Sequence, residues 1–303
     1  MPELPEVETI RLGLAREVVG RCIERVEVYM RPPRTPALPS LRQAQVLRHA
    51  QDERPVRIWQ ARTVAIHRAE GLRRAEGRTI WGVARRGKYL LMDLGGGESL
   101  LMHLGMTGHL ALGEPADLPE KHLYLALRLD DGRELRLSDP RGFGEARLVG
   151  PAEREDLGRR LGPEPLGAEF TVQHLERELA RRTAMVKGLL LNQSVIAGLG
   201  NIYADEALWA ARVHPARRAN TLAREEIAAL HGAIVRVLVE SIPRGGTTFR
   251  DYRDVYGVPG VNRAHLKVYD RAGQPCARCG HPIAGIRVSG RGTWFCPSCQ
   301  TLE

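Results

Sequence analysis

The sequence has few cysteines, no long apolar run and fewer acidic than basic side chains, and each shortage excludes a class of protein. Only five cysteines occur in 303 residues, and four of them lie in the last thirty. This distribution excludes the disulfide framework of a small secreted domain, so we expect a cytosolic chain. Because the sequence contains no signal-peptide segment and no stretch that could cross a bilayer, we expect no membrane partner.

Acidic side chains are outnumbered, with 36 Asp and Glu against 45 Lys and Arg, which gives a net charge of +9. A surplus of this size favours a polyanionic partner, most often a nucleic acid. Most of the basic residues are arginines, so bidentate contacts to phosphates are available. A basic protein without such a partner explains the charge equally well, and the motifs must decide.

The first ten residues carry the most distinctive pattern. Proline in second position is a common signal for removal of Met1, which would leave Pro2 as a free secondary amine. A terminal amine has a pKa of about 8, so part of it is an uncharged nucleophile at neutral pH. Glu3 and Glu6 share one helical face, where either could move protons for the amine. The alternative is that Pro2 only directs processing and the acids only favour a helix start.

Apolar spacing predicts an N-terminal helix followed by a half that is rich in strands. Leu4 to Val18 carries apolar residues at steps of three and four, and Gly20 would end this helix. Strands are predicted at residues 22–29, 79–84, 88–94, 99–104, 124–129, 134–137 and 145–149. Many short strands with tight turns favour a β-sandwich or barrel. The proline-rich residues 31–78 are predicted to be a largely exposed excursion, with a short helix at 41–50 and a strand at 56–66.

Three polar loops of the strand-rich half present candidate binding residues. Lys88 stands at the start of an apolar strand, and His103 and Met106 flank a glycine turn. Arg141 and Phe143 belong to another glycine-rich turn. Loops with Met, Arg and Phe can wedge into a base stack and read the gap by hydrogen bonds. The alternative for each residue is a minor core position or a solvated charge.

A linker and a helical half follow. Residues 151–170 are rich in Pro, Gly and charge, which indicates a domain boundary. Helices are predicted at 171–182, from 184 onward, at 202–211 and at 222–241. Asn201 lies where the third helix begins, and the free N–H groups of a helix start suit a phosphate, although Asn201 could also simply cap the helix. The long loop at 243–263 is predicted to close over a substrate.

The C-terminal segment carries the strongest local signal. Cys276, Cys279, Cys296 and Cys299 form two Cys-x2-Cys pairs separated by sixteen residues. This spacing is typical of a closed tetrahedral zinc site, so we predict one structural zinc ion and no organic cofactor. His281 is not needed as a ligand, because the four thiolates complete the site. A hairpin of residues 286–289 and 293–296 would hold Arg291 at its tip, where it suits a phosphate.

Taken together, the chain resembles the formamidopyrimidine-DNA glycosylases, bacterial base-excision enzymes for oxidised purines. The matching motifs occur in family order: Pro2 to Thr9, Arg86 to Leu90, His103 to Met106, Asp139 to Arg141, Gly200 to Tyr203 and the four cysteines. The resemblance covers nearly all of the chain except residues 31–78. It implies an α+β fold: an N-terminal β-sandwich with an N-terminal helix, then a helix-two-turn-helix domain with a zinc-ribbon hairpin.

The resemblance also implies domain bounds, a partner and a cellular location. We expect the catalytic sandwich at 1–150, a linker at 151–168, the helix-two-turn-helix domain with its lesion loop at 169–266, and the zinc ribbon at 267–303. The partner would be duplex DNA with oxidised bases or abasic sites. We expect a monomer in the bacterial cytoplasm, associated with the nucleoid through DNA.

The family's chemistry implies roles for four residues and a supporting acid. Pro2 would attack the C1′ atom of the damaged nucleotide and form a Schiff base, and Glu3 would protonate the opening sugar ring. Lys88 would donate a proton in β-elimination, and Arg291 would assist δ-elimination. Glu6 would position these groups.

The family's DNA contacts are carried over position by position. Met106, Arg141 and Phe143 would fill the gap left by the extruded nucleotide. The residues expected to hold phosphates are His103, His122, Arg182, Lys187 and Asn201. Gly142 departs from the family, because many relatives carry a basic residue there. Two alternatives stay open: an oxidised-pyrimidine glycosylase like endonuclease VIII, and a non-catalytic zinc-ribbon DNA-binding protein.

Overall fold

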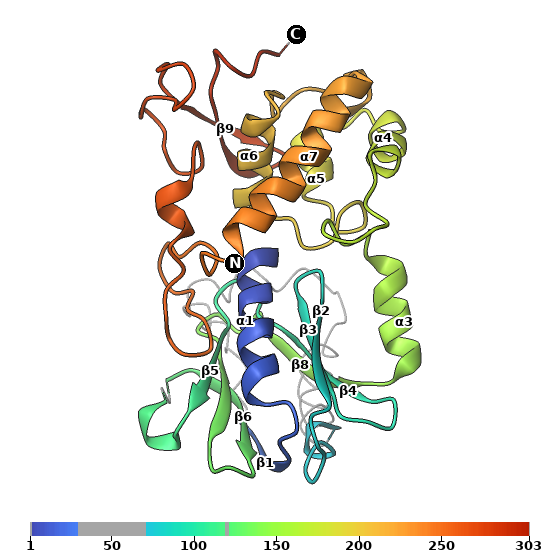
Figure 1. Cartoon of the computed structure of the whole chain (residues 1–303), viewed down its shortest axis with the longest axis vertical. Helices are drawn as coiled ribbons and strands as arrows, with labels where there is room; N and C mark the ends of the chain where they lie inside the picture. The colour runs from blue at the N-terminus through green and yellow to red at the C-terminus, as the bar shows by residue number, and fades with distance from the viewer. Residues whose placement is uncertain (1, 30–70, 119–120, 303) are drawn as a thin grey trace, which may run out of the picture.

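The strand-rich half is a two-layer β-sandwich in the computed structural model, which describes residues 2–29, 71–118 and 121–302 (Figure 1). Both layers are four-stranded and antiparallel, in the orders β1-β6-β7-β5 and β2-β3-β4-β8. The strands are β1 Ile23–Val28, β2 Gly82–Arg86, β3 Tyr89–Asp93, β4 Ser99–His103, β5 His109–Gly113, β6 Leu123–Leu129, β7 Glu134–Ser138 and β8 Glu145–Val149. Alternate apolar residues of both sheets form one buried core.

Helix α1, Leu4–Glu17, closes one side of the sandwich and joins it to the second half of the chain. Val7, Ile10 and Leu14 are buried in the sandwich core, as the apolar stripe predicts. Leu4 instead belongs to the core of the helical half, and its N–H donates to Gly198 O at 3.1 Å. The first turn of α1 is therefore fixed by the helical half, and the rest of the helix by the sandwich.

Two parts of the sandwich differ from the prediction. Strand β5 was not predicted, because it ends on a glycine and its apolar residues Leu110, Ala111 and Leu112 are consecutive and do not alternate with polar ones. The end of the predicted excursion is not exposed, since Leu72 and Ala75 are buried in the sandwich core. The helix predicted at 41–50 and the strand at 56–66 lie outside the described residues.

The predicted linker contains a helix that was not predicted, α3 Pro151–Arg160. Pro151 occupies the first turn, where its missing N–H is not needed, and the Glu153 carboxylate accepts the Gly150 N–H at 3.2 Å. Arg159 and Arg160 at the C-terminal end pair with acids one turn earlier. The ion pairs and the favourable residues at both helix ends together outweigh the loss of helix stability caused by the single interior glycine.

The helical half packs four helices around the core predicted from the sequence. They are α4 Val172–Ala180, α5 Val186–Leu190, α6 Asn201–Ala210 and α7 Arg224–Ser241. Thr171 caps α4 by accepting the His174 N–H at 3.1 Å. Ile227, Leu230, Ile234 and Leu238 of α7 are buried against α6 and α4, as their spacing predicts. No helix in the described part of the chain is long and apolar enough to span a membrane.

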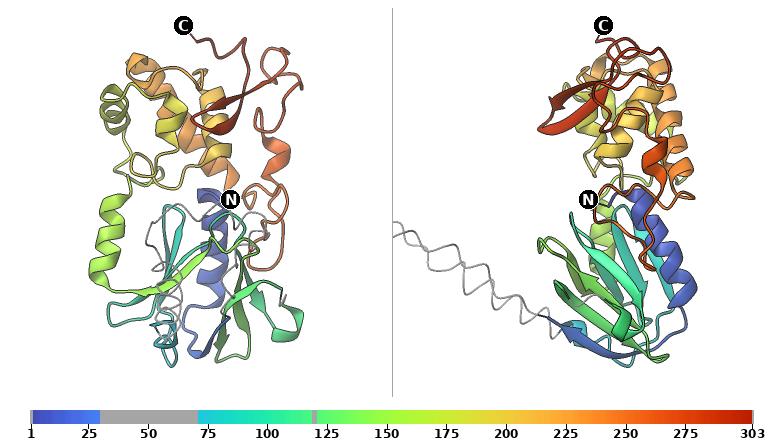
Figure 2. Two further views of the ribbon diagram at one scale, coloured as in Figure 1. Left: turned by 180° about the vertical axis from the view of Figure 1, so that it is seen from behind. Right: turned by 90° about the vertical axis from the view of Figure 1, so that its left-hand side faces the viewer.

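The C-terminal hairpin consists of β9 Ala284–Val288 and β10 Arg291–Phe295. Its turn is Ser289-Gly290, both with positive φ, so Arg291 begins β10 instead of standing at the tip as predicted. Figure 2 shows the hairpin projecting from one side of the helical half, with α7 on the opposite side. Strand β10 packs on α6, so the hairpin is attached to the helix that follows the Gly200 turn.

Candidate active site

Pro2 lies in a cavity at the junction of the two halves. The cavity has a volume of about 220 Å³, and Pro2, Glu6 and Met106 line it together with Ile202 and part of the long loop. The loop residues are Thr247, Phe249, Arg250, Asp251 and Tyr252. The predicted substrate loop therefore borders the N-terminal end of the chain. A ligand in this cavity would therefore contact both the substrate loop and the N-terminal residues.

The Glu3 carboxylate binds free N–H groups at the N-terminus of α6. Its oxygens accept the N–H groups of Ile202 at 3.0 Å and of Tyr203 at 3.4 Å. Two of the free N–H groups at this helix end, where a phosphate was expected, therefore already bind a carboxylate of the chain, and a phosphate contact by Asn201 stays a prediction. Burial raises the pKa of Glu3, whereas Lys88 and the two N–H groups act to lower it. A carboxyl group whose pKa is raised in this way keeps its proton to a higher pH than an exposed glutamic acid does.

Glu6 connects three segments of the chain through hydrogen bonds. Its carboxylate accepts the Glu3 N–H at 2.8 Å, the Tyr203 hydroxyl at 2.6 Å and the Thr247 N–H at 2.6 Å. Burial, and then the charge of Glu3, raise the pKa of Glu6 to about 7. Tyr203 and Thr247 were not singled out from the sequence. No local spacing could have found them, because they lie 197 and 241 residues from Glu6 along the chain.

Lys88 lies close to the two acids. Its side chain is buried, and Gly87, with φ of 56°, turns the chain into β3 just before it. Burial lowers the pKa of Lys88, while the charges of Glu3 and Glu6 act to raise it and that of Arg291 acts to lower it further. The structure thus brings Lys88, Glu3, Glu6 and the exposed Arg291 within electrostatic reach of one another. Lowering the pKa of a buried ammonium favours proton transfer.

Met106, Arg141 and Phe143 gather on two adjoining loops. Arg141 Nη1 lies 3.6 Å from the Met106 sulfur, and the guanidinium lies 5.0 Å from the centre of the Phe143 ring. Buried Asp139 fixes the loops by accepting the Thr107 hydroxyl and the Gly144 N–H, both at 2.6 Å. Phe143 is 56% exposed, so the cluster presents an apolar and a cationic group to solvent.

Lys187 is the main departure among the predicted phosphate ligands. Its side chain is 0% exposed, and its ammonium lies 2.7 Å from Asp205 and donates to Gly292 O and Thr293 Oγ1. Asp205, which was not predicted, also accepts the Trp294 N–H at 3.0 Å. Burial raises the pKa of Asp205 and lowers that of Lys187, and their contact opposes both shifts. Lys187 holds β10 and does not reach the surface.

The other predicted phosphate ligands occupy different settings. Asn201 Nδ2 donates to Gly292 O at 3.0 Å, so it too contacts the hairpin. The His103 ring lies 4.7 Å from the Tyr89 ring and accepts the Gly105 N–H, and burial lowers its pKa. Arg182 is half-buried and pairs with Glu178, one turn earlier in α4. His122 is exposed and has a positive φ of 63°.

The four cysteines Cys276, Cys279, Cys296 and Cys299 converge as their spacing predicts. Their sulfur atoms all lie within 4.8 Å of one another, which fits four thiolates around a single tetrahedral zinc ion. Cys276 and Cys296 are buried, and the Trp209 indole N–H donates to the Cys276 sulfur at 3.4 Å. His281 is not part of the cluster, so the four-thiolate site is closed.

Comparison with known families covers almost the whole chain. The formamidopyrimidine-DNA glycosylase N-terminal domain matches residues 1–146, and the H2TH domain of the same glycosylase matches residues 161–253. A zinc finger found in FPG and IleRS matches residues 273–302.

Individual relatives match over their full length. The formamidopyrimidine-DNA glycosylase of Herpetosiphon aurantiacus is 45% identical over 99% of this chain and 100% of its own. That of Symbiobacterium thermophilum is 46% identical over 100% of this chain and 90% of its own. A Lactococcus lactis FPG mutant in complex with Fapy-dG containing DNA has a TM-score of 0.82 at 34% identity, covering 99% of this chain and 100% of that one. The wild-type Lactococcus lactis protein with an oxidised pyrimidine containing DNA has a TM-score of 0.80 over the same shares at the same identity.

Proposed function

Because the chain belongs to the formamidopyrimidine-DNA glycosylase family, we propose that it is a base-excision repair enzyme that removes oxidised purines from duplex DNA. The observation that carries this proposal is the burial of Pro2 in a cavity between the Glu6 carboxylate and the substrate loop. The full-length likeness to named relatives supports it. The DNA would be bound as a duplex by a monomer in the cytoplasm. We propose that the catalytic sandwich spans residues 1–150, the linker 151–168, the helix-two-turn-helix domain 169–266 and the zinc ribbon 267–303.

In the proposed first step, the Pro2 amine attacks C1′ of the flipped nucleotide. The bond from C1′ to the base breaks, the base leaves with a proton, and the sugar ring opens to an iminium ion on Pro2. Glu3 would donate the proton to the ring oxygen, and its burial beside Lys88 supports that role. Glu6 would hold Glu3 and the substrate loop in place through Thr247.

In the later steps, the iminium ion acidifies the sugar C–H bonds: loss of a C2′ proton expels the 3′ phosphate by β-elimination, and loss of a C4′ proton then expels the 5′ phosphate by δ-elimination. Lys88, with its lowered pKa, would donate the proton in β-elimination. Arg291 would hold a phosphate and assist δ-elimination. Met106, Arg141 and Phe143 would fill the gap in the duplex. His103, His122, Arg182 and Asn201 are the remaining candidates for phosphate contacts.

For Lys187 we propose a positioning role in place of a phosphate contact. It pairs with Asp205 and binds the backbone of β10 directly after Arg291. We expect Lys187→Met to lower the free energy of unfolding by about 3–5 kcal/mol, because Asp205 would stay buried without its partner. Urea unfolding measures this loss. The double change Lys187→Met with Asp205→Asn should recover part of it, and unchanged stability of the single variant would contradict the proposal.

One zinc ion held by Cys276, Cys279, Cys296 and Cys299 supplies structural cross-linking and no chemistry in the reaction. We expect chelation of the metal to unfold the hairpin and weaken DNA binding at least about tenfold, because Arg291 loses its support. A DNA-binding titration with metal analysis measures both effects. Cys22→Ser, outside the cluster, should retain the zinc, and full affinity after proven metal loss would refute the expectation.

A competition experiment tests the proposed lesion class. Two duplexes, one with 8-oxoguanine and one with thymine glycol, are offered together, and we expect preferential excision of 8-oxoguanine. Strong preference for thymine glycol would favour the pyrimidine-specific alternative instead. A Lactococcus lactis relative has been solved with an oxidised pyrimidine containing DNA, so some excision of both lesions is compatible with the proposal.

A further inference from the structure

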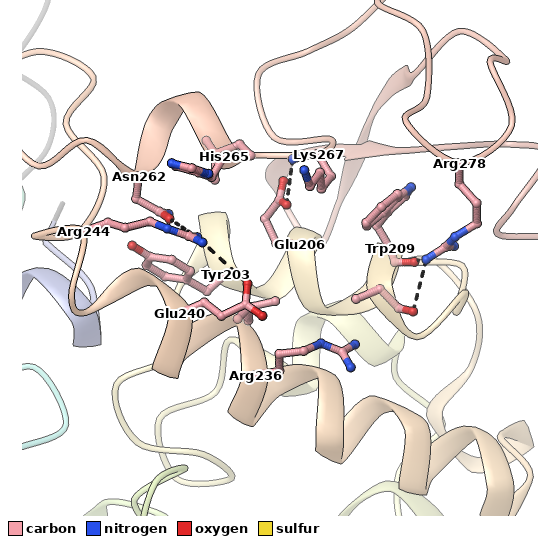
Figure 3. Close-up of a pocket in the computed structure, with 13 residues that line it drawn as sticks. Tyr203, Glu206, Trp209, Arg236, Glu240, Arg244, Asn262, His265, Lys267 and Arg278 are labelled. Atoms are coloured by element: carbon pink, nitrogen blue, oxygen red, sulfur yellow. Dashed lines mark hydrogen bonds and ion pairs between the residues drawn. The ribbon is translucent and has the colours of Figure 1, made fainter.

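The substrate loop, residues 243–263, starts in the helical half and returns to it, and its base is closed there. A single antiparallel bridge pairs Thr247 with Val261. The Asn262 side chain donates to Thr247 Oγ1 at 3.0 Å and accepts Arg244 Nη1 at 3.2 Å (Figure 3). The base of the loop is therefore fixed to the helical half.

The tip of this loop, residues 254–258, forms a turn of its own. The Asp254 carboxylate accepts the N–H groups of Tyr256 at 2.9 Å and of Val258 at 2.8 Å. The Asp254 N–H donates to Val258 O at 2.9 Å, and Gly257 adopts the positive φ of 82° that the turn requires. Because these bonds are internal, the tip keeps its shape and can dock as one piece.

The tip docks on the sandwich, although the loop comes from the helical half. Val255 is 1% exposed and belongs to the sandwich core. Its carbonyl oxygen accepts the Leu112 N–H of the edge strand β5 at 2.9 Å, and the Tyr256 hydroxyl donates to Glu17 of α1 at 3.0 Å. Figure 1 shows the loop running from the end of α7 down beside α1 and β5. The loop thus connects the two halves of the molecule.

Between its two attachment points the loop crosses the cavity that contains Pro2. Residues 249–251 line this cavity together with Pro2. With Val255 docked, the segment between fixed points is only 248–254. With the tip released, the free segment would extend over 248–260, and a longer free segment has more conformations to lose when it is placed over the cavity.

We propose that Val255 is a positioning residue for base excision, which holds the loop tip in the sandwich core and so keeps residues 249–251 against a flipped base. This inference rests on the proposed function. It predicts that two activities separate when the tip is released. An abasic nucleotide has no base for the loop to hold, so excision should slow, whereas nicking of an abasic strand, which depends on Pro2 and Lys88, should not.

Gly13 of α1 offers a way to release the tip, because a Cβ atom there would lie 2.6 Å from Val255 Cγ2 and 3.5 Å from Tyr256 Cε2. In single-turnover reactions we expect Gly13→Ala to excise 8-oxoguanine at least about tenfold more slowly than the unchanged protein. Nicking of a duplex with a preformed abasic site should be unchanged. Val255→Asp leaves α1 intact and should show the same separation, because an unpaired carboxylate does not stay in an apolar core.

Two further variants test whether the clash itself is responsible. Adding Val255→Ala to Gly13→Ala removes the methyl groups that clash and should recover excision. Gly232→Ala, inside α7, places a Cβ with nothing within 4 Å and should excise normally. Circular dichroism spectra check that each variant folds.

The outcomes distinguish this inference from the proposed function. Normal excision by both Gly13→Ala and Val255→Asp would overturn the inference, and so would an equal loss of excision and nicking. If the unchanged protein neither excises 8-oxoguanine nor nicks the abasic duplex, the proposed function is overturned and the inference with it.

Discussion

Protein that keeps any residue before Pro2 is expected to form no covalent adduct with an abasic duplex under borohydride. An amide nitrogen is not nucleophilic, so the iminium ion cannot form, and excision should fall by at least about 10⁴-fold. The measurement compares protein with a processed N-terminus and protein with a short uncleaved extension.

The controls identify the attached atom. Pro2→Gly keeps a terminal amine, a primary one, and should keep DNA binding while changing the lyase step. Peptide mapping of the trapped adduct should find the sugar on Pro2. Full activity of the extended protein, or a sugar attached to a lysine, would refute the terminal-amine mechanism. A protein with no trapped adduct in any form would be a non-catalytic zinc-ribbon DNA-binding protein.

Gly200→Ala is expected to disable catalysis although residue 200 bears no reactive group. A Cβ atom there would lie 2.2 Å from Glu3 Cδ and 2.5 Å from Cγ, so the Glu3 carboxylate would have to leave the N-terminus of α6. A displacement of about 1 Å can cost about 10²-fold in rate, and we expect at least this loss in excision. The measurement is single-turnover excision of 8-oxoguanine.

Gly232→Ala is the matched control. Gly232 lies inside α7, and a Cβ there would meet nothing within 4 Å. This variant should keep full activity and gain about 0.5–1 kcal/mol in the free energy of unfolding, because alanine favours the helix. Wild-type excision by Gly200→Ala would show that the position of Glu3 in the structure is not needed for the reaction.

Local patterns in the sequence predicted the elements that local physics determines. Helix α1, β8 and the core face of α7 follow from apolar spacing, and the zinc site follows from cysteine spacing. The two elements that were not predicted, β5 and α3, also have local explanations. Strand β5 shows no alternation of apolar and polar residues. The glycine and the prolines of the linker segment pointed away from a helix, whereas charge pairs stabilise α3.

The arrangement of the site depends on contacts that no local pattern contains. Glu3 was expected near a sugar, yet the backbone N–H groups that hold it belong to α6, 199 residues later. Lys187 was expected at a phosphate from the resemblance to the family, but Asp205 and β10 enclose it. Asp205 follows Asn201 by one helical turn, so a shared face of α6 was the one signal available for it.

The distance along the chain between Glu3 and α6 imposes an order of events during synthesis. A ribosome adding about 5–20 residues per second needs roughly ten to forty seconds to reach Tyr203 after the first residues are made. Throughout that interval the front of the nascent chain has no α6 to dock against, so an aminopeptidase can reach it. Once α6 has folded, its N–H groups hold the Glu3 carboxylate, and Pro2 lies buried beside Glu6 in the cavity. A chain that ends before α6 therefore lacks the N–H groups that hold the Glu3 carboxylate beside Pro2.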